Sequence, residues 1–213
     1  MLRLAVSVVI LAVVLEQTDG HGYMIDPPNR SSMWRLGYKT PVCHRDNAFH
    51  CGKSEIQEQY GGRCGECGDV YGSPRPRQNE NTGKYGRGIV TRRYRAGQVI
   101  TATVNITANH KGWFRFSLCP LTSAEALEEE SCFQRNVLQL ADNPNSSQFY
   151  LPHNAPALFE VKLQLPANLT CERCVMQWHY QANKINTCSD GRRDRGCGPQ
   201  PMFRSCADIA IEP

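Results

Sequence analysis

Eleven cysteines, all between Cys43 and Cys206, constrain this 213-residue chain more than any other feature of its sequence. In an oxidising compartment, cysteines at this density form disulfides, whereas in the cytosol they more often bind metals or carry out redox chemistry. The compartment therefore decides how the cysteines are interpreted. The odd count also means that one thiol is free, pairs between chains or is capped, and the sequence does not reveal the pairing.

The first twenty residues have the pattern of a secretory signal peptide. Arg3 supplies positive charge, an apolar run from Leu4 to Leu15 is interrupted only by Ser7, and the segment ends in polar and small residues. The run has 12 residues, whereas a helix that crosses a bilayer needs about 20. We therefore expect residues 1–20 to be removed after Gly20. The mature chain would be a secreted, extracellular protein of residues 21–213, a single domain that begins at His21 and is not bound to a membrane.

Two C-x-x-C pairs, Cys64 with Cys67 and Cys171 with Cys174, have spacing found in zinc ribbons. However, 103 residues separate the two pairs, and ribbons use about 15–20. In a secreted chain, disulfides are the better interpretation of these cysteines.

Four Asn-x-Ser/Thr sequons occur, at Asn29, Asn105, Asn145 and Asn168. Such sequons accept glycans in exposed loops of secreted proteins. Four of them in one chain favour exposed, glycosylated loops.

Alternating apolar and polar residues predict several short strands, at 99–108, 113–118, 159–165, 175–180 and 205–211. A capping box at Thr122-x-x-Glu125 predicts one short helix over Ala124–Glu130. Between His21 and Gly88 the chain is rich in Gly, Pro and Cys without sustained periodicity, which indicates long ordered loops. We expect an all-β protein, an antiparallel β-sandwich of the immunoglobulin or fibronectin III type. Its N-terminal loops would be stapled by disulfides, and its helices would at most be short.

His21 becomes chemically special if cleavage exposes it, because one residue then carries a free α-amine and an imidazole that can chelate together. The amine has an ordinary pKa of about 7.7–8.0, so a bound metal can displace its proton near neutral pH. Nitrogen ligands in a tetragonal arrangement suit Cu(II). His110 is the best source of another imidazole, since it continues the parity of the predicted strand at 99–108, where a side chain can point along a sandwich tip. An ordinary solvated or hydrogen-bonded histidine is the alternative at each position.

Six blocks of sequence, in order, resemble the lytic polysaccharide monooxygenases of auxiliary activity family 15, the group that contains chitin-binding type-4 domains. The resemblance covers essentially the whole mature chain. The blocks are His21-Gly22, Asp26-Pro27-Pro28-Asn29-Arg30, Ser32-Met33-Trp34-Arg35, Cys64-Gly65-Glu66-Cys67-Gly68-Asp69, Thr107-Ala108-Asn109-His110-Lys111-Gly112, and Gly196-Cys197-Gly198-Pro199-Gln200 with Phe203-Arg204-Ser205-Cys206-Ala207-Asp208-Ile209.

The resemblance implies an enzyme with one copper ion held in a histidine brace. His21 would supply its amine and Nδ1, and His110 its Nε2. Phe203 matches the family's axial position, where an apolar ring would block the site without ligating; core packing is its alternative. Ala108 matches the small residue near the copper, with strand packing as its alternative. Gln177 is a further candidate for an amide close to the site.

The implied reaction is oxidative rather than hydrolytic. Copper, an external electron donor, and hydrogen peroxide or dioxygen would hydroxylate C1 or C4 beside a glycosidic bond, after which the polysaccharide chain breaks. The expected partner is a chitin surface, with cellulose as second choice, met by a monomer. Tyr23, Trp34, Tyr38 and Tyr60 are candidates for a flat surface that packs on sugar rings.

Three other function classes remain open. A non-catalytic chitin- or glycan-binding module is the main alternative, and a disulfide-rich ligand resembling a growth factor is a weaker one. A carboxylate-pair glycosidase is the hydrolytic rival, although no carboxylate spacing singles out a pair. The net charge of +4 gives no reason to expect nucleic acid as a partner. Two features depart from the family pattern: residues 182–186 carry less Gly and Trp than expected, and Cys43 is the candidate for the odd cysteine.

Overall fold

The computed structural model describes residues 21–213, and the expected signal peptide lies outside the described residues. Within the described part, no helix is both long and apolar enough to cross a membrane. The helices and strands follow in chain order: β1 (His21–Asp26), η1 (Met33–Leu36), α1 (Lys53–Gln59), β2 (Arg92–Arg95), β3 (Val99–Ala108), β4 (Trp113–Pro120), α2 (Glu130–Arg135), β5 (Gln139–Leu140), β6 (Phe149–Tyr150), β7 (Ala157–Gln164), β8 (Cys171–Gln181), β9 (Ile185–Thr187), β10 (Arg193–Arg195) and β11 (Met202–Glu212).

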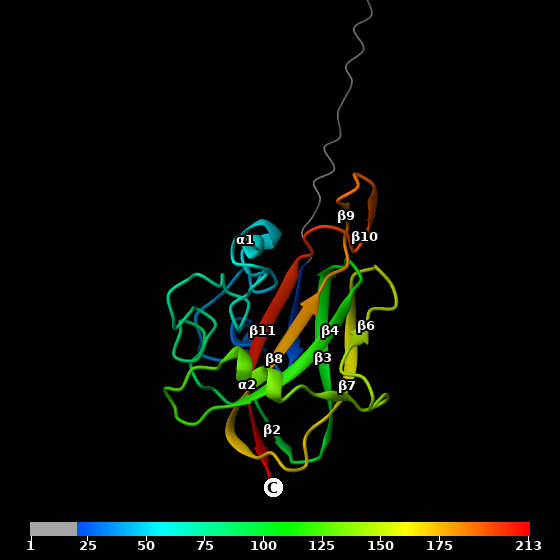
Figure 1. Cartoon of the computed structure of the whole chain (residues 1–213). Coiled ribbons are helices and arrows are strands. Elements are labelled where there is room, and N and C mark those ends of the chain that lie inside the picture. The colour runs from blue at the N-terminus through cyan, green and yellow to red at the C-terminus, as the bar shows by residue number, and fades with distance from the viewer. Residues whose placement is uncertain (1–20) are drawn as a thin grey trace, which may run out of the picture.

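Two sheets form a β-sandwich, as expected (Figure 1). A four-stranded sheet has the order β1-β3-β7-β5, a five-stranded sheet has the order β2-β11-β8-β4-β6, and β9 and β10 form a separate hairpin. The strand pairs are antiparallel except that β2 runs parallel to β11. Alternate residues of β3 and β7 pack against alternate residues of β4, β8 and β11 to form one hydrophobic core. Burial of this shared face is the main force that holds the two sheets together.

His21 and His110 lie at the same end of the sandwich. At this end β1, β4 and β11 begin and β3 and β8 finish, and the β9–β10 hairpin projects beyond it (Figure 1). We call it the His21 end, after the first residue of β1. The C-terminus lies at the opposite end of the sandwich.

The long N-terminal loops are confirmed in part: no named strand lies between Asp26 and Arg92 among the described residues, but residues 21–26, which were expected to be loop, form β1. These loops contain two short helices, η1 and α1, that the sequence did not predict. The helix expected over Ala124–Glu130 is wrong, since α2 begins only at Glu130. The Ser123 hydroxyl accepts hydrogen bonds from the backbone N–H groups of Glu125 and Ala126 and forms a local turn. Glu129, the residue before α2, has an extended backbone with φ −121° and ψ 145°.

Ten of the eleven cysteines form disulfides, and Cys43 is the free, buried one, as expected. Cys171 bonds to Cys174, whereas Cys64 and Cys67 take different partners. The five bonds are Cys51–Cys64, Cys67–Cys206, Cys119–Cys132, Cys171–Cys174 and Cys188–Cys197. The C-x-x-C pairs are therefore not zinc ligands.

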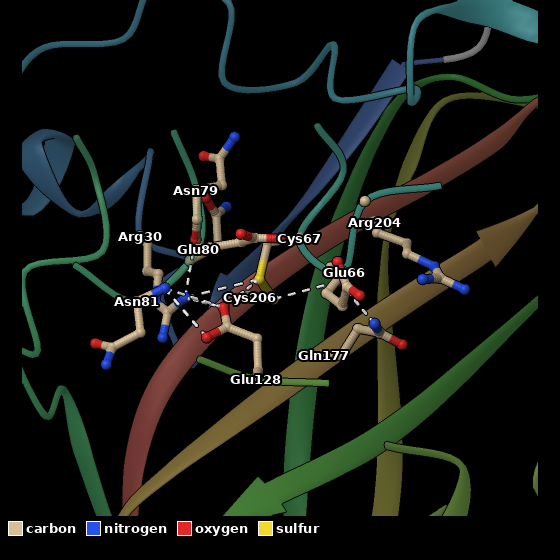
Figure 2. The surroundings of a disulfide bond; sticks show 12 residues. Arg30, Glu66, Cys67, Asn79, Glu80, Asn81, Glu128, Gln177, Arg204 and Cys206 are labelled. Atoms are coloured by element: carbon tan, nitrogen blue, oxygen red, sulfur yellow. Dashed lines mark hydrogen bonds and ion pairs between the residues drawn. A yellow bond between two sulfur atoms is a disulfide. The ribbon is translucent and has the colours of Figure 1, made fainter. Parts of the chain in front are cut away.

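The loops are joined to the five-stranded sheet by a buried ionic cluster beside the Cys67–Cys206 disulfide (Figure 2). The guanidinium of Arg30 donates to both carboxylate oxygens of Asp208, at 2.9 and 2.7 Å, and to Glu128. Arg30, Asp208 and Glu128 are each at most 1% exposed. Because unpaired charges are costly in a protein interior, this cluster holds the segment around Arg30 against β11.

The structure corrects one of the expected glycan acceptors. Asn29 is 1% exposed, and its amide donates to the Met24 carbonyl at 2.7 Å and to the Ser32 hydroxyl at 2.9 Å. A side chain buried by these bonds cannot carry a glycan in the folded protein. Asn145 and Asn168 are exposed, and Asn105 is half-buried on β3.

Candidate metal centre

His21 is positioned by the first residues of β1. In the antiparallel pairing of β1 with β3, the Cα of His21 lies opposite that of Ala108. The Thr107 hydroxyl donates to the His21 carbonyl at 3.3 Å, and the Gly22 N–H donates to the Asn47 carbonyl at 2.9 Å. These bonds attach the start of β1 to both the sheet and the loops, so the place of His21 in the fold is set by its backbone.

Gly22 allows the close approach of β1 to β3. A Cβ at this position would lie 2.4 Å from Ile106 Cδ1 and 3.1 Å from the Asn105 carbonyl oxygen. Only glycine therefore fits next to His21 without moving a neighbour.

His110 lies two residues beyond the end of β3, in a tight turn. Its backbone N–H donates to the Tyr180 hydroxyl at 3.1 Å, and that hydroxyl donates to the Lys111 carbonyl at 2.8 Å. Lys111 and Gly112 both have positive φ, 57° and 96°. A Cβ on Gly112 would lie 2.0 Å from the Gln181 carbonyl oxygen, so this turn packs directly on the end of β8. The turn keeps His110 at the same end of the sandwich as His21.

Phe203 is the second residue of β11 and lies in the interior at the His21 end. It is fully buried on β11, opposite Tyr180 of β8, and the two rings stack with centroids 5.5 Å apart. The imidazole of His50 contacts the Phe203 ring edge to face, at 6.0 Å between centroids. Burial raises the pKa of the Tyr180 phenol to about 12, so Tyr180 stays neutral and keeps its hydroxyl proton as a donor. Phe203 thus combines core packing with a place at the His21 end.

The other two candidates differ from one another. Ala108 lies opposite His21 in the β1–β3 pair. Gln177 is not brought to this end: it lies three positions before Tyr180 on β8, so its side chain points to the opposite face of the sheet. Its amide donates to the Glu66 carbonyl at 2.7 Å (Figure 2). Gln177 therefore binds the loop that contains Glu66.

The sequence analysis missed Tyr180 and His50 as neighbours of the site. Tyr180 had a usable signal, because the alternation over 175–180 places it on the inward face at the end of a strand. His50 had none, since it comes from an irregular loop.

The aromatic residues expected on a flat surface are all half-buried. Trp34 contacts His44 and the guanidinium of Arg35, and the ring of Tyr60 contacts that of Tyr71. Trp34 therefore packs within the loops, which was its alternative interpretation.

The donor set at the His21 end fits copper. His21 and His110 offer imidazole nitrogens, and neutral imidazole suits this metal. Within residues 21–213, three His, Cys, Asp or Glu ligand atoms come within 4.8 Å of one another only at Cys67, Glu128 and Cys206, where both sulfurs belong to a disulfide.

Comparisons with known proteins identify the family of this chain. The family model described as "Lytic polysaccharide mono-oxygenase, cellulose-degrading" matches residues 21–209. The solved structure "Lytic Polysaccharide Monooxygenase AA15 from Thermobia domestica in the Cu(I) State" is 42% identical, with a TM-score of 0.84, and the match covers 90% of this chain and 99% of that chain. LPMO10B from Micromonospora aurantiaca is 13% identical with a TM-score of 0.46, covering 89% and 99%. No curated protein matches.

The family match extends over nearly all of the described residues, and the match to the AA15 structure, at 42% identity, covers 90% of the chain. The chain belongs to the lytic polysaccharide mono-oxygenase family and is a copper-dependent polysaccharide monooxygenase of the AA15 group.

Proposed function

We propose that the mature protein is a single secreted domain of residues 21–213 that uses a histidine brace to break glycosidic bonds in chitin, with cellulose as second choice. His21 binds one copper ion through its α-amine and Nδ1, and His110 binds it through Nε2. The observation that carries this proposal is the β1–β3 register, which puts His21 opposite Ala108, two residues before His110. The family match supports it further, because that match begins at His21.

Copper in this place supplies one-electron redox chemistry with an external electron donor and with hydrogen peroxide or dioxygen. The chain's own residues orient the ligands and shape their surroundings. The ring of Phe203 has no atom that can bind a metal. The copper ligands that the chain supplies are therefore all nitrogens. Ala108 keeps the space beside His21 small and apolar. The Tyr180 hydroxyl holds the turn that carries His110.

A solid polysaccharide is the substrate that this location favours. A crystalline polymer cannot enter an enclosed cavity, but it can meet residues at the end of a sandwich, and His21 and His110 are only half-buried there. The resemblance to chitin-binding type-4 domains favours chitin, and the family description names cellulose. We propose that the protein acts on either surface as a monomer.

Secreted protein with its leader processed naturally provides the test. Mass spectrometry of the N-terminus is expected to find His21 as residue one, and electron paramagnetic resonance is expected to find one tightly bound Cu(II). With ascorbate and peroxide, the protein is expected to release oxidised oligosaccharides from β-chitin, and fewer from cellulose. Absence of such products from both polymers would contradict the proposal.

A pair of histidine variants separates the enzyme from a non-catalytic module. His110→Ala is expected to lose copper and oxidised products while it still binds chitin. The matched control is His44→Ala, an exposed histidine in the loops, which is expected to keep both. If His110→Ala retains full copper affinity, the brace is wrong.

A further inference from the structure

The backbone of His110 is held through both of its flanking peptide groups. Its N–H donates to the Tyr180 hydroxyl at 3.1 Å. Its carbonyl oxygen accepts from the Asn183 N–H at 3.2 Å and from the Arg195 guanidinium at 3.4 Å. The same guanidinium nitrogen donates to the Asn183 carbonyl at 2.6 Å. Arg195 therefore joins the turn that carries His110 to the segment that follows β8.

Arg195 comes from the β9–β10 hairpin, which is itself firmly attached. The Cys188–Cys197 disulfide joins the turn after β9 to the segment that follows β10. The Gln200 side chain accepts from the Lys184 N–H at 2.6 Å, and the Asn186 amide donates to the Pro199 carbonyl at 3.1 Å. The hairpin projects beyond the His21 end (Figure 1). It can thus present Arg195 from a defined direction.

The bonds of Arg195 differ from those of its neighbour Arg192. Arg192 forms an exposed ion pair with Asp190 at 2.6 Å. Among the described residues no carboxylate within ion-pair distance of Arg195 is found, and its guanidinium is directed at two backbone carbonyls instead. An exposed arginine gains little stability from such bonds. Its place next to His110 suggests a role in orienting that residue.

We propose that Arg195 is a positioning residue for His110, and that the β9–β10 hairpin thereby sets the direction of the His110 imidazole; this rests on the proposed copper brace. His110 lies outside the β3 ladder and is followed by two residues with positive φ, so sheet pairing does not fix its peptide plane. Groups that ligate metals need support from surrounding hydrogen bonds, because small rotations weaken binding. Arg195 and Asn183 supply that support on the carbonyl side.

The first test uses copper-free protein. In Arg195→Ala, amide hydrogen exchange at Lys111, whose N–H shares a peptide group with the His110 carbonyl, followed by NMR, is expected to be roughly fivefold faster, because a hydrogen bond that restrains this peptide group is lost. Arg195→Lys keeps a donor and a positive charge and is expected to restore most of the protection. Arg193→Ala, an exposed arginine of the same hairpin, is the matched control and is expected to exchange as wild type.

The second test uses copper-loaded protein. Arg195→Ala is expected to change the Cu(II) electron paramagnetic resonance spectrum and to weaken copper binding severalfold. The copper affinity of Arg195→Lys is expected to lie between those of wild type and Arg195→Ala. Thermal unfolding of the copper-free Ala variant is expected to match that of the Arg193→Ala control, which excludes a general loss of stability. Wild-type exchange and spectrum in Arg195→Ala, or equal changes in Arg193→Ala, would overturn the proposal. If wild type binds no copper, the proposed function fails, and the exchange measurement still decides the role of Arg195.

Discussion

Gly22 has no side chain, and this lets β1 lie close to its partner strand β3. Gly22→Ala would place a methyl group 2.4 Å from Ile106 Cδ1 and 3.1 Å from a backbone oxygen, so β1 has to move. We expect a loss of about 1–3 kcal/mol of stability, the usual cost of overpacking, and weaker copper binding because His21 moves with Gly22. Calorimetry and copper titration would measure the two effects.

Thr101→Ala, an exposed change on β3, serves as the control for Gly22→Ala. Its effect on stability is expected to stay within about 0.5 kcal/mol, with copper binding as in wild type. Equal behaviour of the two variants would show that the contact at Gly22 does not constrain β1.

Single residues also show where prediction from sequence stops. His110 could be singled out because strand parity and the following turn are local features. Gln177 could not be placed, since its partner Glu66 is 111 positions away and only the folded chain brings them together. Asn29 belongs to an Asn-x-Ser sequon, but its side chain is buried by hydrogen bonds to Met24 and Ser32 that the motif does not reveal.

Among elements, long strands were predictable and short helices were not. β3 and β7 alternate over eight or more residues, a signal that needs no knowledge of the partner strand. α1 has no side-chain cap, and both Gly52 and Lys53 at its start have positive φ, so no local motif marks it. At the predicted capping box, a turn made by Ser123 competes successfully with helix initiation. The pairing of the strands into two sheets follows from burial, which single segments do not reveal.

At the scale of the whole molecule, the Arg30 cluster joins loops and sheet. Arg30→Met would leave Asp208 and Glu128, both fully buried, without their cation. Removing one partner of a buried ion pair costs about 3–5 kcal/mol, so we expect a loss of that size in denaturant unfolding. Arg93→Met breaks an exposed pair with Glu212 at 3.0 Å and is expected to cost about 0–1 kcal/mol. Similar losses in both variants would show that the buried cluster does not hold the loops.

The buried carboxyl of Glu66 makes the stability of the whole molecule depend on pH. Burial, with a hydrogen bond shared with Glu80, raises the pKa of Glu66 from its ordinary 4.5 to about 7. Between these values the folded chain keeps a proton that the unfolded chain has lost, so this residue contributes less stability as pH rises. In Glu66→Gln the amide can donate to Glu80 at every pH, and this dependence disappears.

We therefore expect the melting temperature of Glu66→Gln, minus that of wild type, to rise as pH increases from about 4.5 to about 7 and to level off above. Scanning calorimetry at half-unit steps would follow it, and taking the difference removes the contributions of the other titrating groups. Glu129→Gln, a change at an exposed carboxylate paired with Arg75, is expected to give a flat difference over the same range. Parallel curves for Glu66→Gln and wild type would mean that Glu66 is already ionised in the folded protein, and that the charges of Arg75 and Arg77 outweigh its burial.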